Sequence, residues 1–518
     1  MLVRSIAFLA ALLANATFAA EPNKLAAKLD AILDGPDFKH SHWGVLVVDA
    51  KSGESLFERN AEKLFAPASV TKLFSVASAL ETFGPKFVFE TPVYARGDVA
   101  KDGTLKGDLI LVASGDPSFG GRDSKDGKLA FQNYDHTYAN SGLAEAKLTD
   151  TDPLAAIKDL AKQVHAAGIR SVEGDVLIDE RLFPRGRSSG SGPDVLSAIC
   201  INDNVLDVTI EPGEKPGDPA KVSVRPETST ILLDVDVATK DKSSVPLTLL
   251  SQTAPGQFAL RGRVPAGGKP IVAILPIEDP ALFARTHFIE QLRKRGVKVA
   301  APLVRPTSAA LPEIKDYATM KPIAQYASSP ISEVFNVTLK VSHNLYASMI
   351  PCLVAARGGK STMEDGLKMQ RKILKGLGVD TDQVSFGSSA GGSVADLVTP
   401  KATVQLLQGL KAKETWSEFQ SWLPVYGVDG TLVDAADKDS PAKGKVFAKT
   451  GTNFWADAVN NRPLLKSKAL AGVMATSSGR ELLFAIFVND VPIKADMTIA
   501  KIGKVLGKVC DVLHADSE

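Results

Sequence analysis

The spacing of apolar residues predicts a β-hairpin and then a helix in the first part of the chain. Trp43 to Val48 and residues 54–59 are two β-rich runs joined by a Lys-Ser-Gly turn, which is typical of a hairpin. From Pro67 to Gly84 apolar residues recur every three or four positions, so we expect a helix with one buried face. That face comprises Val70, Leu73, Phe74, Ala77 and Leu80.

The middle of the chain, residues 91 to about 315, follows a different pattern. Short β-rich runs are separated by Gly, Pro and Asp, and two helical patches, 153–167 and 281–295, interrupt them. No fixed period indicates a repeat array. The predicted strands include Asp108–Val112, Asp175–Ile178, Val205–Ile210 and Ile231–Val237.

From Pro330 helical patterns return, and the chain then ends in strands and a helix. Ala469–Met474 and Glu481–Val488 flank a Ser-Ser-Gly-Arg turn and predict a second hairpin. A last amphipathic helix is expected from about 495 to 514, and we interpret its apolar stripe as packing on a sheet. Its lysines leave contact with a membrane surface as an alternative. The stripe comprises Ile499, Ile502, Val505, Leu506, Val509 and Leu513.

Composition narrows the class of protein only moderately. The 518 residues suggest two or three domains, and a hydrophobic content of 44% is ordinary for a globular protein. The net charge of +1, with no dense basic stripe, argues against nucleic acid as the main partner.

The N-terminus has the features of a secretory signal peptide. Arg4 precedes a short apolar run, Ile6 to Ala14, and small residues suit cleavage near Ala19 or after Ala16. No segment approaches the roughly 20 apolar residues that a membrane span needs. We therefore expect no transmembrane span, and a periplasmic or otherwise extracytoplasmic location after cleavage.

Cysteines and histidines give no metal or disulfide framework. Cys200, Cys352 and Cys510 are an odd, sparse set that contains no C-x-x-C motif; one disulfide pair and three buried free thiols both remain open. The seven histidines are scattered, and none forms H-E-x-x-H. We predict no metal and no cofactor.

Three short motifs stand in a fixed order: S-x-x-K at Ser69–Lys72, S-x-N at Ser342–Asn344 and K-T-G at Lys449–Gly451. Together they are the signature of penicillin-binding proteins and serine β-lactamases. A second S-x-x-K, at Ser440–Lys443, shows how little one motif proves. It follows a charged run, and no apolar helix follows it, so we interpret it as a loop.

The residue types of the first motif suit nucleophilic catalysis. Ser69 and Lys72 are three residues apart at the start of a predicted helix, so their side chains lie on the same side. A serine needs a base, and a lysine is a base only when neutral. Lowering a lysine pKa from about 10.4 to near 7 costs roughly 4–5 kcal/mol. A second cation about 4 Å away contributes up to about 4 kcal/mol at an effective dielectric of 20, and Lys449 is the candidate.

The other two motifs suit substrate binding. Lys449 follows a β-like run and can hold a carboxylate, which Thr450 can also hydrogen-bond. Gly451, on an edge strand, would let a substrate backbone approach closely. Ser342 and Asn344 open a helix, where a hydroxyl and an amide can relay a proton and bind an amide; a helix N-cap is the alternative for Ser342.

At these residues the chain resembles the class C, type-4 penicillin-binding proteins, the D-alanyl-D-alanine carboxypeptidase/endopeptidase family. Leu64–Ser69, Gly107–Pro117 and Leu423–Leu432 look like segments of that family. The gap of about 270 residues between Lys72 and Ser342 is similar to the family's large insertion.

The resemblance implies an α+β fold: a penicillin-recognising domain with an antiparallel sheet and helices, split by β-rich inserted subdomains. It implies hydrolysis of peptidoglycan peptides ending in D-Ala-D-Ala, or of peptide cross-links, through an acyl-enzyme, and acylation by β-lactams. The implied divisions are 1–20 signal peptide, 21–90 peptidase domain (first part), 91–315 insertion and 316–518 peptidase domain (second part).

The resemblance also implies a role for each motif residue. The nucleophile would be Ser69, its favoured base Lys72 and the proton relay Ser342. Asn344 would bind the acyl-side amide, Lys449 and Thr450 the terminal carboxylate, with Gly451 beside them. The backbone N–H groups of Ser69 and Thr452 would form the oxyanion hole.

Three departures from the family pattern and three rival functions stand beside this prediction. His343 occupies a position where relatives often carry Asp, Asn or Glu, and we interpret it as a surface histidine, with titration near neutrality as the alternative. The Gly387–Ser393 loop differs from the family's sequence, and residues 453–468 are long and polar. The rivals are a wall-binding pseudo-enzyme, a β-lactamase, and an esterase with a G-x-S-x-G elbow completed by Asp396 and His514.

Overall fold

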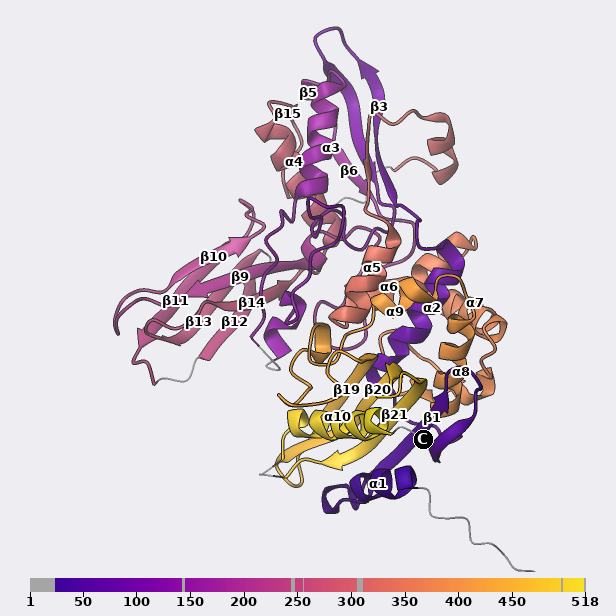
Figure 1. Cartoon of the computed structure of the whole chain (residues 1–518). Helices are drawn as coiled ribbons and strands as arrows, with labels where there is room; N and C mark the ends of the chain where they lie inside the picture. Colours follow the sequence, from indigo (N-terminus) through magenta and orange to yellow (C-terminus); the bar gives the residue numbers. More distant parts are fainter. Residues whose placement is uncertain are drawn as a thin grey trace, which may run out of the picture.

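The computed structural model describes residues 24–141, 145–243, 247–254, 256–304, 311–494 and 497–516. The predicted signal segment, 1–20, lies outside the described residues. The chain forms one body built on a sheet and helices, from which two β-rich lobes project (Figure 1). Among the described residues, no helix has the length and apolar character of a membrane span.

A five-stranded antiparallel sheet forms the base of the main body, in the order β19-β20-β21-β1-β2. Both predicted hairpins are confirmed, and they meet because β1 pairs with β21 along its whole length. β19 lies at the free edge, which confirms the expected edge strand. The strands are β1 His42–Asp49, β2 Ser55–Arg59, β19 Val446–Asp457, β20 Arg462–Ala475 and β21 Glu481–Pro492.

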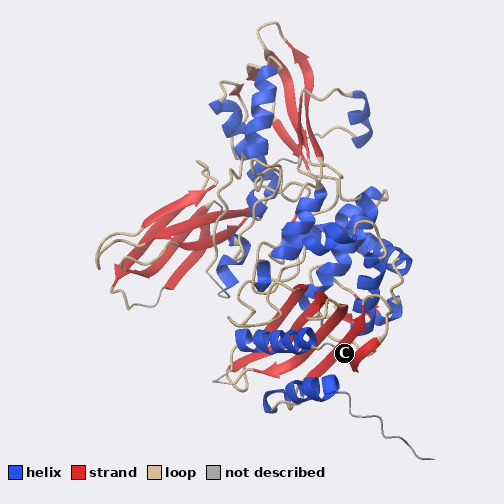
Figure 2. Cartoon of the chain, in the orientation of Figure 1, coloured by secondary structure: helices blue, strands red, loops and turns tan. Residues whose placement is uncertain are grey.

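Helices cover both faces of this sheet (Figure 2). α1 (Lys24–Leu33) and α10 (Ile499–Ala515) share one buried cluster with Phe484 and Ile486 of β21. The prediction that the last helix packs on a sheet is therefore confirmed. The other face carries α2 Thr71–Phe83, α5 Ile331–Lys340, α6 Asn344–Arg357, α7 Met363–Gly376, α8 Pro400–Lys411 and α9 Trp416–Ser421.

Helix α2 is more deeply buried than its sequence predicted. The predicted apolar face is buried, but so is every other residue from Thr71 to Leu80, because α5, α6 and α7 all contact the helix. The expectation of one buried face was therefore wrong. Polar residues such as Lys72 and Ser75 thus lie inside the protein, where each needs a partner.

The first projecting lobe is a six-stranded sheet in the order β15-β5-β4-β3-β16, with β6 paired to β4. Helices α3 (Ala155–Ala166) and α4 (Pro280–Lys294) pack with it. β16 pairs with β3, so this lobe also contains a strand that follows residue 315, the expected end of the insertion. The strands are β3 Glu90–Val99, β4 Thr104–Val112, β5 Ser171–Val172, β6 Val176–Asp179, β15 Lys298–Val299 and β16 Ala324–Ala327.

The second lobe lies within the first in sequence and consists of two three-stranded sheets, β10-β9-β14 and β11-β13-β12. A bridge between Pro219 and Ala238 joins them. The strands are β9 Val205–Glu211, β10 Lys221–Arg225, β11 Leu232–Lys240, β12 Leu247–Ala254, β13 Gln257–Pro265 and β14 Ile271–Pro276. Two short pairs complete the described strands: β7 Gly186–Arg187 with β8 Val195–Leu196, and β17 Val384–Ser385 with β18 Leu397–Val398.

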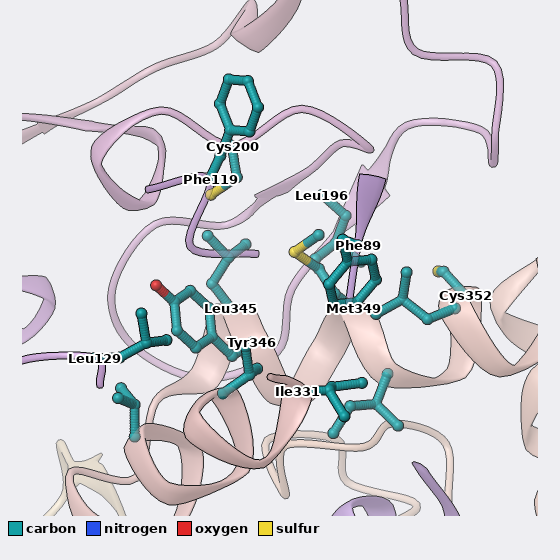
Figure 3. Close-up of a cluster of buried hydrophobic side chains, with 14 of the residues drawn as sticks. Phe89, Phe119, Leu129, Leu196, Cys200, Ile331, Leu345, Tyr346, Met349 and Cys352 are labelled. Atoms are coloured by element: carbon teal, nitrogen blue, oxygen red, sulfur yellow. The ribbon is translucent and has the colours of Figure 1, made fainter. Parts of the chain in front are cut away.

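All three cysteines are buried and free, so of the two alternatives left open by the sequence the structure has three free thiols and no disulfide pair. Figure 3 shows Cys200 and Cys352 in the hydrophobic cluster where α6 meets the inserted lobes. Together with Phe119 and Met349 they join the insertion to the main body through one continuous core. The insertion is therefore packed against the helices and not merely tethered to them.

The contact between α6 and α7 gives a stability prediction. A Cβ added at Gly366 of α7 would lie 1.9 Å from the carbonyl oxygen of Pro351 in α6, so Gly366→Ala should destabilise the protein by about 1–3 kcal/mol. At Gly376, on the same helix, no atom lies within 4 Å of an added Cβ, and Gly376→Ala should stabilise by up to about 1 kcal/mol. Urea denaturation of both variants tests this, and shifts of the same sign would contradict it.

Candidate functional site

The three motifs meet at one cavity of about 670 Å³, beside the edge strand of the main sheet. Ser69, Ser342 and Thr450 line it, one from each motif. Tyr138 and Ser191 of the inserted segment also line it. The cavity is thus built from parts of the chain that are far apart in sequence.

Ser69 lies in a tight turn that leads directly into α2. The turn, Ala68–Val70, is a 3₁₀ helix, and Ala68 has a φ of 46°, a conformation that non-glycine residues rarely adopt. Because Lys72 follows one turn later, its Nζ lies 2.8 Å from Ser69 Oγ. The predicted juxtaposition of these two side chains is present.

Lys72 is fully buried, and its environment favours the neutral amine. Burial, and then the charge of Lys449, hold the pKa of Lys72 well below its ordinary value, against the opposing effect of Asp396. Nζ donates to Asn344 Oδ1 at 2.7 Å and to Ala390 O at 2.8 Å. Both are acceptors only, so they take the two N–H groups of a neutral amine and leave its lone pair for the Ser69 hydroxyl.

Ser342 and Asn344 face this pair from the start of α6. Lys449 Nζ donates to Ser342 Oγ at 2.9 Å, and Asn344 Nδ2 donates to Ser191 O at 2.8 Å. Ser342 has a φ of 64° and is not the N-cap; His343 caps the helix, since its Nδ1 accepts from Tyr346 N. The N-cap alternative for Ser342 was therefore wrong.

His343 is buried and not a surface residue, contrary to the sequence-based interpretation. Its ring stacks on Tyr346 with 3.8 Å between ring centroids, and Nε2 lies 3.7 Å from Asp203 Oδ2 of the inserted segment. Burial lowers the pKa of His343, so the ring is neutral at pH 7. In the sequence His343 is one polar residue between two motif residues, and nothing in that pattern indicates that other side chains bury it.

The third motif lies on the edge strand β19. Lys449 is buried, and burial followed by the charge of Lys468 lowers its pKa to about 7. Thr450 Oγ1 donates to Thr431 Oγ1 at 2.7 Å. A Cβ at Gly451 would lie 2.4 Å from the carbonyl oxygen of Pro67, so the close approach at this glycine is made by the protein's own chain and not by a substrate.

Thr452 ends the row of motif residues and is linked to a lysine that sequence reasoning missed. It pairs with Lys468 across β19 and β20, and Lys468 Nζ donates to Thr452 Oγ1 at 2.8 Å. Burial lowers the pKa of Lys468 to about 8. Lys449 and Lys468 are 19 residues apart, a spacing that matches no motif, and only the register of β19 and β20 places them near each other. The residues around Asn453 that looked long and polar form the outer part of this β19–β20 hairpin.

The Gly387–Ser393 loop closes the site behind Lys72. Gly391 has a φ of 90°, and an added Cβ would lie 1.9 Å from Ala68 O, so the loop packs directly on the turn that carries Ser69. Ser389, the serine of the G-x-S-x-G pattern, donates through Oγ to Ala347 O at 2.8 Å, and Asp396 Oδ2 accepts from Ser388 Oγ. His514 lies on α10 and contacts Ala475 O instead, so the esterase triad is not assembled. The second S-x-x-K lies in turns, as expected, and Ser440 donates to Asp511.

One group of potential metal ligands occurs among the described residues: Asp135, His136 and Asp203. Their donor atoms lie within 4.8 Å of one another, but Arg122 donates to both aspartates. A guanidinium thus occupies the position that a cation would take. The absence of a metal from the reaction stays a prediction from the sequence.

Comparisons with known proteins identify a family and relatives for this chain. A family model described as D-Ala-D-Ala carboxypeptidase 3 (S13) matches residues 25–506. The chain is 28% identical to a D-alanyl-D-alanine carboxypeptidase of Actinomadura sp. (strain R39), over 84% of this chain and 78% of that protein. It is 22% identical to the D-alanyl-D-alanine carboxypeptidase DacB of Haemophilus influenzae, over 87% and 85%.

The fold is shared with a solved structure, penicillin binding protein 4 from Haemophilus influenzae, at a TM-score of 0.70 and 20% identity, over 94% of this chain and 99% of that one. The same protein complexed with a β-lactam superposes with a TM-score of 0.67 and 20% identity, over 94% and 98%. These similarities confirm the predicted fold class.

The buried Lys449 gives a prediction of pH-dependent stability. Its pKa is about 7 in the folded protein and about 10.4 when unfolded, so the unfolded state binds the extra proton between these values. The lysine therefore destabilises the fold most at and below pH 7, by roughly 5 kcal/mol, and this effect fades as the pH rises to about 10. The free energy of unfolding of Lys449→Met minus that of the native protein should therefore decrease from pH 7 to pH 10.

Urea denaturation at pH 7, 8, 9 and 10 measures this slope. The hydrogen bonds lost in Lys449→Met change its free energy of unfolding by the same amount at every pH, so the slope of the difference with pH still reports the titration of Lys449. Lys63→Met, at an exposed lysine, is the control and should follow the native protein at every pH. A difference for Lys449→Met that stays constant with pH would contradict the prediction.

Proposed function

The chain belongs to the D-Ala-D-Ala carboxypeptidase 3 (S13) family of serine-type DD-peptidases, and we propose that it cleaves D-Ala-D-Ala peptides through an acyl-enzyme on Ser69. The substrates are peptidoglycan stem peptides that end in D-Ala-D-Ala, and peptide cross-links of the same configuration. One observation carries this proposal: a buried lysine, whose pKa is held well below its ordinary value by burial and by the charge of Lys449, lies 2.8 Å from the hydroxyl of Ser69.

Acylation begins when Lys72 takes the Ser69 proton and Oγ attacks the scissile carbonyl carbon. The carbonyl π electrons move to oxygen, where the N–H groups of Ser69 and Thr452 stabilise the negative charge. The C–N bond then breaks, and the proton that Lys72 took from Ser69 passes through Ser342 to the leaving amine, so that Lys72 is neutral again. The hydrogen bond from Lys449 to Ser342 Oγ supports this relay, since it connects the hydroxyl to a second amine that titrates near neutrality.

Deacylation repeats the same chemistry with water as the nucleophile. Lys72 removes a proton from water, the hydroxide oxygen attacks the ester carbon, and Ser69 leaves with the proton. A water molecule is thus consumed for each terminal D-Ala released, and the enzyme returns to its starting state.

Recognition rests on the C-terminal carboxylate and on the amide before it. Lys449 and Thr450 hold the carboxylate, and the second hydrogen of Asn344 Nδ2 is available for the acyl-side carbonyl. Gly451 keeps β19 close to the Pro67–Ser69 turn, which aligns these contacts with the nucleophile. β-Lactams, which present a carboxylate and a strained amide, acylate the same serine.

A catalytic role explains the buried lysine better than a binding role does. A wall-binding protein needs a groove and a carboxylate site, but it gains nothing from a second, uncharged lysine beside Ser69. Neutralising Lys72 lowers stability without improving affinity. The features of residues 1–20 support a location outside the cytoplasm, where peptidoglycan is found.

Intact mass of the mature protein after incubation with benzylpenicillin tests this function, with Ser69→Ala as the matched variant. We expect the mass of one benzylpenicillin on the native protein and no addition on Ser69→Ala, because the new ester is made with Ser69 Oγ. Release of D-Ala from a D-Ala-D-Ala peptide should disappear in the same variant.

The other outcomes identify the rivals. A folded native protein that gains no mass and releases no D-Ala would overturn the proposal in favour of the binding protein. Fast loss of benzylpenicillin without a lasting adduct would point to a β-lactamase.

A further inference from the structure

A buried network of charged side chains lies in the inserted segment, directly behind the S-x-N motif. Arg122 donates to Asp135 at 2.8 and 2.9 Å and to Asp203 at 2.7 and 3.0 Å. His136 contacts Asp203 at 2.7 Å through Nε2 and Asp207 at 2.6 Å through Nδ1. All five side chains are buried, so the network is rigid and costly to break.

Opposite charges balance in this network. Burial opposes the charged imidazole, but the carboxylates of Asp207 and Asp203 raise the pKa of His136 to about 10. Arg225 adds a third cation, 3.0 Å from Asp207. Three cations therefore face the three carboxylates of Asp135, Asp203 and Asp207.

The backbone that carries Asp203 is strained. Asn202, Asp203 and Asn204 are consecutive and have φ values of 49°, 54° and 55°. Non-glycine residues uncommonly adopt this left-handed conformation, and three in a row persist only where the surroundings hold them. Asn202 Nδ2 donates to Asp207 Oδ2, and Asn204 Oδ1 accepts from Ile201 N, so the side chains on either side of Asp203 hold the backbone of this run.

Asp203 reaches the S-x-N motif through two aromatic rings, that of Tyr346 in α6 and that of the N-cap residue His343. Tyr346 OH donates to Asp203 Oδ1, and the ring of Tyr346 stacks on His343. Figure 3 shows Tyr346 projecting from its helix into the same buried cluster as Cys200 of the inserted segment. The Arg122 guanidinium lies 5.8 Å from the centre of the same ring, which adds a cation–π contact.

A second contact reaches the motif from the insertion. Tyr138 OH donates to the carbonyl oxygen of Ser342. Ser342 has a φ of 64°, so its peptide group needs an external contact to stay in place. The same residue must present Oγ to Lys449 on one side and to the leaving amine on the other. A change of φ towards the common negative range would turn Oγ away from both.

We propose that Tyr138, together with Asp203 acting through Tyr346 and His343, is a positioning device by which the insertion holds Ser342 in its proton-relay conformation. This inference rests on the proposed function, since it concerns the same acyl transfer. It makes the insertion a working part of the site and not a spacer. Its effect falls on the chemical step of acylation and not on the binding of the ligand.

A double-mutant cycle with benzylpenicillin tests the positioning role. Tyr138→Phe removes one hydroxyl and should lower the limiting acylation rate constant about 10-fold, because small misplacements of reacting groups can cost up to about 100-fold. The dissociation constant of the non-covalent complex should stay unchanged. In a Ser342→Ala background, the same substitution should change the rate less than 2-fold, because the relay it positions is already absent.

Tyr326→Phe is the matched control. Tyr326 OH donates to Asp123, another buried tyrosine hydrogen bond that does not touch the S-x-N motif, so this variant should acylate at the native rate. Tyr346→Phe removes the hydrogen bond to Asp203, which is the second contact of the positioning device. This variant should also be acylated more slowly, and its effect should likewise nearly disappear in the Ser342→Ala background. It also keeps the test decisive if Tyr138→Phe fails to fold.

The failure of this inference is distinguishable from failure of the proposed function. If the native protein is acylated but the tyrosine variants retain the native rate, or lose the same factor with and without Ser342, the positioning role is overturned. If the native protein forms no adduct, the proposed function itself fails.

Discussion

The lowered pKa of the buried Lys72 is the constraint on which the rest of the site depends. A lysine remains uncharged at neutral pH only when water is excluded and other charges oppose the proton. Burial of α2 on all sides supplies the first condition, and Lys449 on the edge strand supplies the second. Three segments complete its hydrogen bonds: the Ser69 turn, the start of α6 and the Gly387–Ser393 loop. The stability of the whole body therefore has to offset a lysine placed against its ordinary chemistry.

The topology explains how a long insertion can separate the first two motifs without separating their side chains. The chain leaves the main body after α2 and returns before α5 at the same point. Ile331 N donates to Phe87 O at 2.8 Å, and Ser328 N donates to Phe89 O at 3.0 Å. Because the two crossings are hydrogen-bonded to each other, the lobes add to the body without altering its helices, as inserted domains with adjacent ends generally do.

The sequence predicted those parts of the fold that depend on local pattern. The hairpins, the helix after Pro67, the edge position of the third motif and the closeness of Ser69 to Lys72 all follow from periodicity or spacing. The errors concern burial and register, which are set by distant segments. His343 looked exposed because one polar residue says nothing about the tyrosine and aspartate that cover it. Lys468 lies opposite Thr452 only because two strands pair in one register.

Backbone strain shows why the motifs are informative only together. Ala68, directly before the first motif, and Ser342, the first residue of the second motif, both have positive φ values. The turn at Ala68 is held between Gly391 of the loop and Gly451 of the edge strand, where any side chain would collide with it. Ser342 is held by Lys449 from a different segment. Each motif thus adopts its conformation only when the others are in place, and the isolated S-x-x-K at Ser440 forms no such site because it lacks these neighbours.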